Sequence, residues 1–340
     1  MKILLSADPF IPVPPAHYGG IERIIDSLVT EFRKRGITVG LVAHSESTCE
    51  SDAFFPWSDT APPNAWRIHC QSLRQAARLF NPDVLHSFSR LSYLAPLMFS
   101  PYPKIMSYQR ATGGRNITAF NSLIRNLHFT GCSEHICQQG RSAGGHWTPI
   151  HNFVAIEKFD YVAQVPADAP LVFLSRMEAI KGAHRAIQIA RTAGKPLILA
   201  GNRVDTPVGI QYWKEKIEPE LDGTQIKYIG EVDDQKKNKL LGSASALLVP
   251  IEWDEPFGIV FAEALACGTP VISSPRGALP EIITSGKHGF LINSQREGVD
   301  AIHRLHRINR KACRTHCEAF FTSSVVATQY IHLYQQVLNS

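Results

Sequence analysis

Short β-rich runs alternate with amphipathic stretches along nearly the whole chain, and this alternation restricts its fold more than any other feature. Residues 2–7 form the first such run. Apolar residues then recur at helical spacing over 21–32, before a glycine, Gly36, and a second run at 38–43. A strand, a helix and a strand of these lengths predict a parallel pair joined by a right-handed crossover.

The alternation comes in two consecutive series, separated by the weakly periodic stretch 159–169, which we expect to be a linker. Further strands are predicted at 84–88, 105–108, 129–132 and 150–153 in the first series, and at 171–175, 196–200, 226–229, 246–249, 271–273 and 290–292 in the second. The prediction is therefore an α/β protein with two Rossmann-like doubly wound domains, 1–162 and 163–322. Ligands of such sheets bind beyond the carboxyl ends of the strands, so the two domains are expected to face a cleft.

Composition narrows the class of protein. The 340 residues are 44% hydrophobic and 19% charged, which is typical of folded chains, and the net charge of +5 is spread over both halves. Neither half forms a basic arm, so no nucleic acid is expected as a partner. No window of about 18 apolar residues predicts a spanning helix, and the first residues lack the apolar stretch of a secretory signal. Together with seven widely spaced cysteines, an odd number, these features favour a cytoplasmic protein.

Two groups of thiols and imidazoles lie close in sequence: Cys132, His135 and Cys137, and Cys313, His316 and Cys317. Neither group has a second pair at ligand spacing, so we expect ordinary thiols and no metal site. His44 and His86 lie at or near predicted strand ends, where a functional role and a structural role both stay open.

The strongest constellation is a pair of carboxylates, Glu255 and Glu263, that follows the predicted strand 246–249. Pro256 suits a first helical turn and Gly268 a helix end, so a helix is predicted over 256–267 with Glu255 at its mouth. The second carboxylate lies eight residues on, about 12 Å along the axis. That span matches the distance between the sugar and the ribose of a nucleotide sugar. The alternative is an acidic residue that favours the helix dipole, followed by a surface glutamate.

Two further features suit a diphosphate. Arg176 follows the predicted strand 171–175, and Lys181-Gly182 begins the next helix, so two cations lie at one strand-to-helix turn. A solvated basic turn is the alternative. Gly19 and Gly20, between the first strand and its helix, allow the backbone to approach a phosphate. No G-x-G-x-x-G occurs at that turn, which argues against a dinucleotide-binding enzyme.

The motifs around these residues resemble those of the retaining glycosyltransferases of family 4 (group 1), which have the GT-B fold. The segment from Glu255 to Glu263 resembles the family's E-x7-E signature. The resemblance covers nearly the whole chain, and its motifs are specific in the C-terminal half. Further similar segments are Tyr18-Gly19-Gly20-Ile21-Glu22, Asn152-Phe153-Val154, the donor-phosphate turn Ser175-Arg176-Met177-Glu178-Ala179-Ile180-Lys181-Gly182, Gly268-Thr269-Pro270-Val271-Ile272 and Gly289-Phe290-Leu291.

The resemblance implies a metal-independent, retaining hexosyltransferase that needs no cofactor and uses a nucleotide-diphosphate sugar as co-substrate. Residues 1–162 would be the acceptor domain, with a C-terminal helix at about 323–340 packing back on it, and 163–322 the donor domain. By similarity, the catalytic residues would be Glu255, Arg176 and Lys181. The donor-binding residues would be Gly19, Gly20, Gly201, Asn202, Glu231, Val232, Phe257, Gly258, Ile259 and Glu263.

One departure from the family lies after the predicted strand 104–108. Many members carry a histidine there that contacts the 6-position of the sugar, and this chain has Gln109 followed by Arg110. Either the 6-position of the transferred sugar differs from a simple hexose hydroxymethyl group, or Gln109 or Arg110 makes the contact with the sugar or the acceptor. The glycine-rich basic segment 110–115 could meet a phosphorylated acceptor or be a mobile surface loop.

The acceptor and the location are open at this stage. A sugar, a lipid-linked glycan and a small molecule are all compatible acceptors. The basic run Arg33-Lys34-Arg35 could bring the enzyme to the inner face of a membrane as a peripheral protein, or it could be a solvated helix end. Alternative functions are another GT-B nucleotide-sugar enzyme, epimerase- or phosphorylase-like, and a two-domain sugar-binding protein without catalysis.

Overall fold

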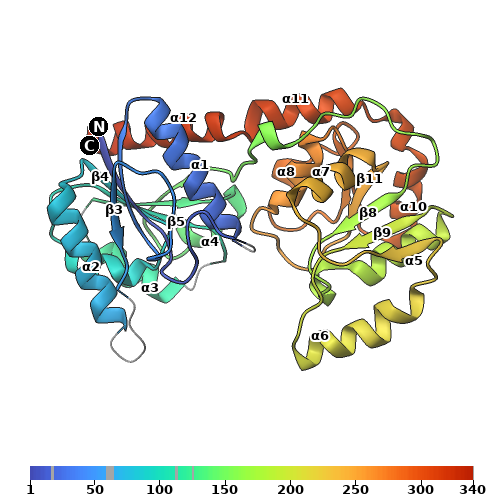
Figure 1. Cartoon of the computed structure of the whole chain (residues 1–340), viewed down its shortest axis with the longest axis horizontal. Helices are drawn as coiled ribbons and strands as arrows, with labels where there is room; N and C mark the ends of the chain where they lie inside the picture. Colours follow the sequence, from blue (N-terminus) through green and yellow to red (C-terminus); the bar gives the residue numbers. More distant parts are fainter. Residues whose placement is uncertain (17–18, 59–64, 112–113, 125, 340) are drawn as a thin grey trace. The chain divides into compact units, whose positions relative to one another are not determined.

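The computed structural model describes the whole chain except residues 17–18, 59–64, 112–113, 125 and 340. The chain divides into two compact units. One comprises Met1–Phe153 together with Ser323–Ser340, and the other comprises Val154–Thr322 (Figure 1). The first unit therefore contains both ends of the chain, and the second is built from one continuous segment.

The first unit contains a parallel sheet in the order β3-β2-β1-β4-β5-β6-β7. Its strands are β1 (Lys2–Ser6), β2 (Thr38–Ala43), β3 (Ala53–Pro56), β4 (Val84–Ser87), β5 (Lys104–Tyr108), β6 (Leu127–Gly131) and β7 (His146–Pro149). Its helices are α1 (Gly20–Lys34), α2 (Ala65–Phe80), η1 (Leu91–Leu97), α3 (Gly114–Leu123), α4 (Glu134–Arg141) and α12 (Ser323–Leu338). Strand order reverses between β1 and β4, which is the topological switch point of a doubly wound sheet.

The second unit repeats this plan with a parallel sheet in the order β10-β9-β8-β11-β12-β13. The strands are β8 (Leu171–Leu174), β9 (Leu197–Ala200), β10 (Ile226–Tyr228), β11 (Ala246–Val249), β12 (Val271–Ser273) and β13 (Gly289–Leu291). The helical segments are η2 (Ile156–Lys158), η3 (Ala179–Lys181), α5 (Ala183–Thr192), α6 (Pro207–Tyr212), η4 (Trp213–Ile217), η5 (Glu218–Glu220), α7 (Asp234–Ser243), α8 (Ile259–Ala266), α9 (Leu279–Ile282), α10 (Gln295–His303), η6 (Leu305–Arg307) and α11 (Arg310–Phe320). The predicted class of two Rossmann-like α/β folds is confirmed.

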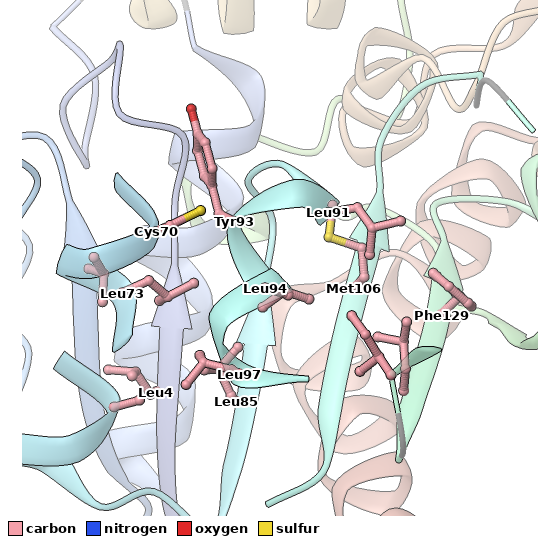
Figure 2. Packing of buried hydrophobic residues seen from close by; sticks show 14 of the residues in the cluster. Leu4, Cys70, Leu73, Leu85, Leu91, Tyr93, Leu94, Leu97, Met106 and Phe129 are labelled. Carbon is pink, nitrogen blue, oxygen red and sulfur yellow. The ribbon is translucent and has the colours of Figure 1, made fainter. Parts of the chain in front are cut away.

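The inner strands of each sheet are buried on both faces, which explains why they are almost continuously apolar. In the first unit, side chains from neighbouring strands meet residues of α2 and η1 (Figure 2). The buried residues in contact there include Leu4, Leu73, Leu85, Leu94, Leu97 and Met106. This packing, rather than helix propensity, holds α2 against the sheet.

The C-terminal helix α12 is joined to the first sheet by a buried polar network. The Tyr334 hydroxyl lies 2.6 Å from Nδ1 of His86, and Nε2 of His86 lies 2.6 Å from the Ser107 hydroxyl. Burial lowers the pKa of His86 to about 3, so the ring is neutral. Of the two roles that the sequence leaves open for His86, the structure favours the structural one.

Two strand predictions differ from the structure. The stretch 150–153 is not a strand, because β7 ends at Pro149. The Ile150 amide still bonds to the Gly131 carbonyl, but the chain then leaves the sheet, and the Val154 amide bonds to the Phe321 carbonyl at 2.9 Å. The edge strand β3 was not predicted at all, since it has only four residues and ends in a proline.

The neutral state of His86 predicts a pH-dependent contribution to stability. In the unfolded chain the imidazole takes up a proton below about 6.5, whereas the folded protein resists this down to about 3. The stabilisation is therefore present above pH 6.5 and is lost as the pH falls through this window. We expect the cost of His86→Gln, measured by urea unfolding, to shrink by about 1.4 kcal/mol per pH unit below 6. A cost that does not depend on pH would contradict this assignment.

Candidate active site

The predicted site residues of the second unit follow neighbouring strands of one sheet. Arg176 comes after β8, Gly201 after β9, Glu231 after β10 and Glu255 after β11. Because β10, β9, β8 and β11 are adjacent and parallel, their carboxyl ends lie along one edge. The structure thus brings segments far apart in sequence to the same edge of the sheet, where ligands of doubly wound folds bind.

These strand ends are tied to one another through the backbone. The Gly201 amide donates to the Gly230 carbonyl at 2.8 Å, and the Met177 amide donates to the Asn202 carbonyl at 2.8 Å. A Cβ on Gly201, whose φ is +128°, would lie 2.0 Å from the Ser175 carbonyl oxygen, so a glycine is required there. Asn202 itself is exposed beside this close approach.

Glu255 is buried, and two donors hold one of its oxygens. Lys181 Nζ lies 2.6 Å from Oε2, and the Trp253 indole N–H donates to the same oxygen at 2.9 Å. The Lys181 ammonium also lies 4.4 Å from the centre of the Trp253 ring. Among the described residues none donates to Oε1, so the carboxylate is oriented and keeps one oxygen for a ligand.

The two predicted cations have different partners. Lys181 pairs with Glu255, whereas Arg176 is 47% exposed in its side chain and lies 3.0 Å from the Glu178 carboxylate. Arg176 lies between β8 and the short helix η3, and Lys181 is the last residue of η3. Each cation is therefore neutralised by its own carboxylate in this structure.

The helix after Glu255 begins later than predicted. It spans Ile259–Ala266 instead of 256–267, because Gly258 adopts φ +81° and ψ +77° and cannot be part of a right-handed helix. Phe257 is buried against Phe321, with ring centroids 5.7 Å apart. Glu255 accordingly lies in the loop before α8, four residues ahead of Ile259, and not at the first helical turn.

Glu263, within α8, is also held by a lysine. Lys237 of α7 lies 2.6 Å from its Oε1 and 3.3 Å from the Asp234 carboxylate. Burial works against the charged ammonium, but the carboxylates of Glu263 and Asp234 outweigh it and raise the pKa of Lys237. Each glutamate of the E-x7-E pair thus has one oxygen fixed by a lysine from a different element.

Tyr228, the last residue of β10, and Trp213 of η4 form an aromatic pair, with ring centroids 4.7 Å apart. The Tyr228 hydroxyl donates to the Gly201 carbonyl at 2.8 Å, and the Arg203 guanidinium lies 4.0 Å from the Trp213 ring centre. Glu231 is exposed and Val232 is half-buried, just ahead of α7. Sequence reasoning missed Arg203, Trp213 and Tyr228, since no motif links the three.

In the first unit the predicted residues gather at the carboxyl edge of the other sheet. Gly19 caps α1, Gly20 is its first residue, and Tyr18 and residues 112–113 of the predicted loop lie outside the described residues. Gln109 and Arg110 follow β5, and the buried Gln109 Oε1 has no partner among the residues that the structure places. Burial raises the pKa of Glu22, and the Asp8 carboxylate adds to this while Arg110 opposes it.

Other motifs do not form sites. Residues 140–144 read G-x-S-x-G, but Ser142 lies at the C-terminus of α4 and not on a strand-to-helix turn. Within the described ranges, no group of three His, Cys, Asp or Glu side chains could hold a metal ion. The same part of the chain contains no helix long and apolar enough to cross a membrane.

Because the Lys181–Glu255 pair is buried, its loss should be costly and non-additive. Lys181→Met leaves a buried carboxylate with only the Trp253 donor, and we expect a cost of about 3–5 kcal/mol in unfolding free energy. Adding Glu255→Gln should recover part of that cost, since no unpaired charge remains. The matched control is Arg185→Met, whose half-exposed partner Glu252 lies 3.7 Å away, and this change should cost less than about 1 kcal/mol. Additive costs in urea unfolding would contradict the pairing.

Comparison with known proteins gives a family match that lies within the second unit. Residues 162–314 match the family model described as glycosyl transferases group 1. A glycogen synthase of Mycobacterium tuberculosis is 33% identical over 150 residues, which is 42% of this chain and 35% of that protein. A phosphatidyl-myo-inositol mannosyltransferase of Mycobacterium leprae is 33% identical over 122 residues, or 34% of this chain and 33% of that protein. These matches span about a third of each relative's own length.

Solved structures match over nearly the full chain. Sucrose-phosphate synthase of Thermosynechococcus elongatus superposes with a TM-score of 0.79 at 19% identity, covering 99% of each chain. Anabaena Alr3699/HepE, solved in complex with UDP-glucose, has a TM-score of 0.76 at 16% identity, covering 99% of this chain and 100% of that one. At such identities the likeness establishes the fold alone. Residues 162–314 are therefore similar in sequence to the group 1 glycosyl transferases, and the chain as a whole has the GT-B fold of solved glycosyltransferases.

Proposed function

We propose that this protein is a retaining glycosyltransferase that moves a sugar from a nucleotide-diphosphate sugar to an acceptor hydroxyl. The observation that carries the proposal is the Glu255 carboxylate, which is oriented by Lys181 and Trp253 through Oε2 and keeps Oε1 for a ligand. A carboxylate held in this way can accept from the hydroxyls of a sugar with little reorganisation.

The donor would lie along the carboxyl edge of the second sheet. Glu255 accepts from the transferred sugar, and Glu263, oriented through Oε1 by Lys237, accepts from the ribose. The remaining donor contacts would be backbone N–H groups of Phe257, Gly258 and Ile259 for the sugar and distal phosphate, Gly201, Asn202, Glu231 and Val232 around the base, and Gly19 and Gly20 near the diphosphate. The first N–H groups of a helix have no carbonyl partner within it, so the start of α8 favours an anion.

In the chemical step, the bond between the anomeric carbon and the diphosphate oxygen breaks, and its electron pair leaves with the diphosphate. The acceptor oxygen attacks from the same face and passes its proton to a phosphate oxygen, so the configuration is retained. Arg176 and Lys181 stabilise the developing charge. Because both cations are paired in this structure, donor binding must draw each from its carboxylate towards the diphosphate. These two charges are the reason to propose that no metal is needed.

The acceptor class is proposed from the first unit. Gln109 Oε1 is buried and has no hydrogen-bond partner among the described residues, so it favours a hydroxyl or amine donor from a ligand. The exposed Arg110 beside it favours an anionic group. A sugar, a lipid-linked glycan or another small hydroxyl compound would each satisfy this chemistry. The mannosyltransferase relative and the UDP-glucose-bound structure support a sugar donor and a hydroxyl acceptor.

A panel of nucleotide sugars tests the proposal, first by thermal shift and then by product analysis. Glu255→Gln keeps the shape of the side chain but removes its charge, and we expect turnover to fall on the order of 100-fold. Glu252→Gln, in the same loop but exposed, is the matched control and should retain activity. The product should keep the anomeric configuration of the donor by NMR, and turnover should persist with EDTA. If no nucleotide sugar in the panel stabilises the protein, this result would count against the proposed function. Unchanged turnover of Glu255→Gln would count against the role assigned to Glu255.

The orphan oxygen of Gln109 gives a second test. Gln109→Ala should lower the specificity constant on the order of 10-fold, the value of one hydrogen bond. Gln109→His should shift the preference among donor sugars. Gln335→Ala, an exposed glutamine on α12, is the control and should change neither quantity. Equal rates and equal donor preferences in all three variants would show that Gln109 does not contact the substrates.

A further inference from the structure

An exposed aromatic side chain lies at the carboxyl edge of the first sheet. Phe10 follows β1 by four residues and is 64% exposed. Its loop is fixed nearby, because the Val13 amide donates to the Ser47 hydroxyl at 2.9 Å and the Val13 carbonyl accepts from the amides of Thr48 and Cys49 at 2.9 Å. A single exposed aromatic residue is common on protein surfaces, so its meaning depends on the groups beside it.

The group beside this ring is an arginine. The Arg90 guanidinium lies 5.3 Å from the centre of the Phe10 ring, and Arg90 follows β4, the strand next to β1. Arg90 is exposed, and within the described part of the chain it forms no ion pair with a carboxylate. A guanidinium over an aromatic ring makes a surface that is both apolar and positively charged.

A second arginine follows the next strand along. Strand β4 lies between β1 and β5, and all three are parallel. Arg110 follows β5 by two residues, much as Arg90 follows β4 by three, and it too is exposed without an ion pair among the residues that the structure places. The order of the strands reverses between β1 and β4, and doubly wound sheets bind ligands at this point. Phe10, Arg90 and Arg110 therefore belong to one edge with the position of a binding site.

A carboxylate lies among these groups. Asp8 is half-buried, its Oδ1 accepts a backbone amide of its own loop at 3.3 Å, and no lysine or arginine of the described residues forms an ion pair with it. Burial raises the pKa of Tyr93, and Arg90 opposes this while Asp8 adds to it. Burial likewise raises the pKa of Glu22, where Asp8 adds to the shift and Arg110 opposes it. Asp8 thus acts on groups that lie beside each of the two arginines.

An aromatic ring, two guanidinium groups and a carboxylate together match one kind of ligand. The C–H groups on one face of a sugar ring can pack on an aromatic ring, while its hydroxyls donate to a carboxylate. The two arginines favour a carboxylate or a phosphate on the same molecule. A neutral sugar would leave both guanidinium groups to water, and a simple anion such as inorganic phosphate would leave the aromatic ring uncovered.

We propose that Phe10, Arg90 and Arg110 bind the acceptor, and that the acceptor is a sugar that carries a carboxylate or a phosphate group. The sugar ring packs on Phe10, the two arginines hold the anionic group, and Asp8 accepts from a hydroxyl. Gln109 Oε1, which has no partner among the described residues, accepts from a second hydroxyl. This inference rests on the proposed function in naming the ligand as the acceptor, whereas binding of an anionic sugar at this edge needs no turnover.

The test is titration of the full chain, followed by saturation-transfer difference NMR, with glucose 6-phosphate, glucuronic acid and methyl glucoside. We expect both anionic sugars to bind on the order of 10-fold more tightly than methyl glucoside, with a smaller difference at high salt. Phe10→Ala should weaken binding of all three sugars on the order of 10-fold. Arg90→Gln should weaken only the two anionic sugars, again on the order of 10-fold. The ratio between these two sugars tells which anion the arginines prefer.

The matched controls remove the same kinds of side chain elsewhere in the first unit. Phe99→Ala removes an aromatic residue that is 83% exposed, and Arg74→Gln removes an exposed arginine of α2. Both should bind the three sugars as the unmodified protein does. Equal affinity for methyl glucoside and the anionic sugars, or equal losses in Arg90→Gln and Arg74→Gln, would overturn the proposal. Competition by inorganic phosphate as strong as that by glucose 6-phosphate would also overturn it, since the sugar ring would then add nothing.

Kinetics with a donor from the nucleotide-sugar panel separate this inference from the proposed function. Arg90→Gln should raise KM for an anionic acceptor on the order of 10-fold and leave kcat within about twofold, because Arg90 binds a part of the acceptor that does not react. If no donor is turned over while the anionic sugars still bind through Phe10 and Arg90, the proposed function fails and the binding site stands. If transfer to methyl glucoside is as efficient as transfer to the anionic sugars, the function stands and this inference fails.

Discussion

All strands of both sheets run parallel, and the remaining features of the structure depend on this constraint. Parallel strands need crossover connections, and the crossovers cover both faces of each sheet with helices. They also turn every loop that follows a strand to the same edge. For this reason Arg176, Gly201, Glu231 and Glu255, which span eighty residues of sequence, belong to one edge of the second sheet.

At that edge, charge is balanced before any ligand arrives. Glu255 and Glu263 are largely buried carboxylates, and an unpaired buried charge would be strongly unfavourable. Lys181 and Lys237 compensate these charges, because each ammonium group binds one oxygen of one of the two carboxylates. The same contacts orient the glutamates, so stabilisation of the fold and preparation of the site come from the same ion pairs. In the proposed reaction a diphosphate would then compete with Glu255 for Lys181, which links donor binding to the position of the sugar-binding carboxylate.

Much of the fold and of the site could be predicted from local patterns. Runs of buried apolar residues identified most strands, and the E-x7-E spacing drew attention to Glu255 and Glu263. The failures have physical causes. Strand β3 has only four residues, lies at an edge of the sheet and ends in Pro56, so its sequence gives little signal for a strand. The start of α8 was placed three residues early, because Pro256 favours a first turn while Gly258 adopts a left-handed conformation.

Contacts between residues far apart in sequence could not be predicted, for a different reason. Nothing in the sequence pairs Lys237 with Glu263, or Tyr334 with His86 at a separation of 248 residues, because such pairs form only when helices pack. The basic run at 33–35 looks available for a partner in sequence, and only the placement of Glu31 and Asp52 beside it shows that it is paired within the protein. The sequence by itself determined the two α/β layers and the residue types at the strand ends, since these follow from local periodicity and turn chemistry. The tertiary structure alone decided which charges are paired and which carboxylate oxygens stay open for a ligand, since these depend on distances between elements far apart in the chain.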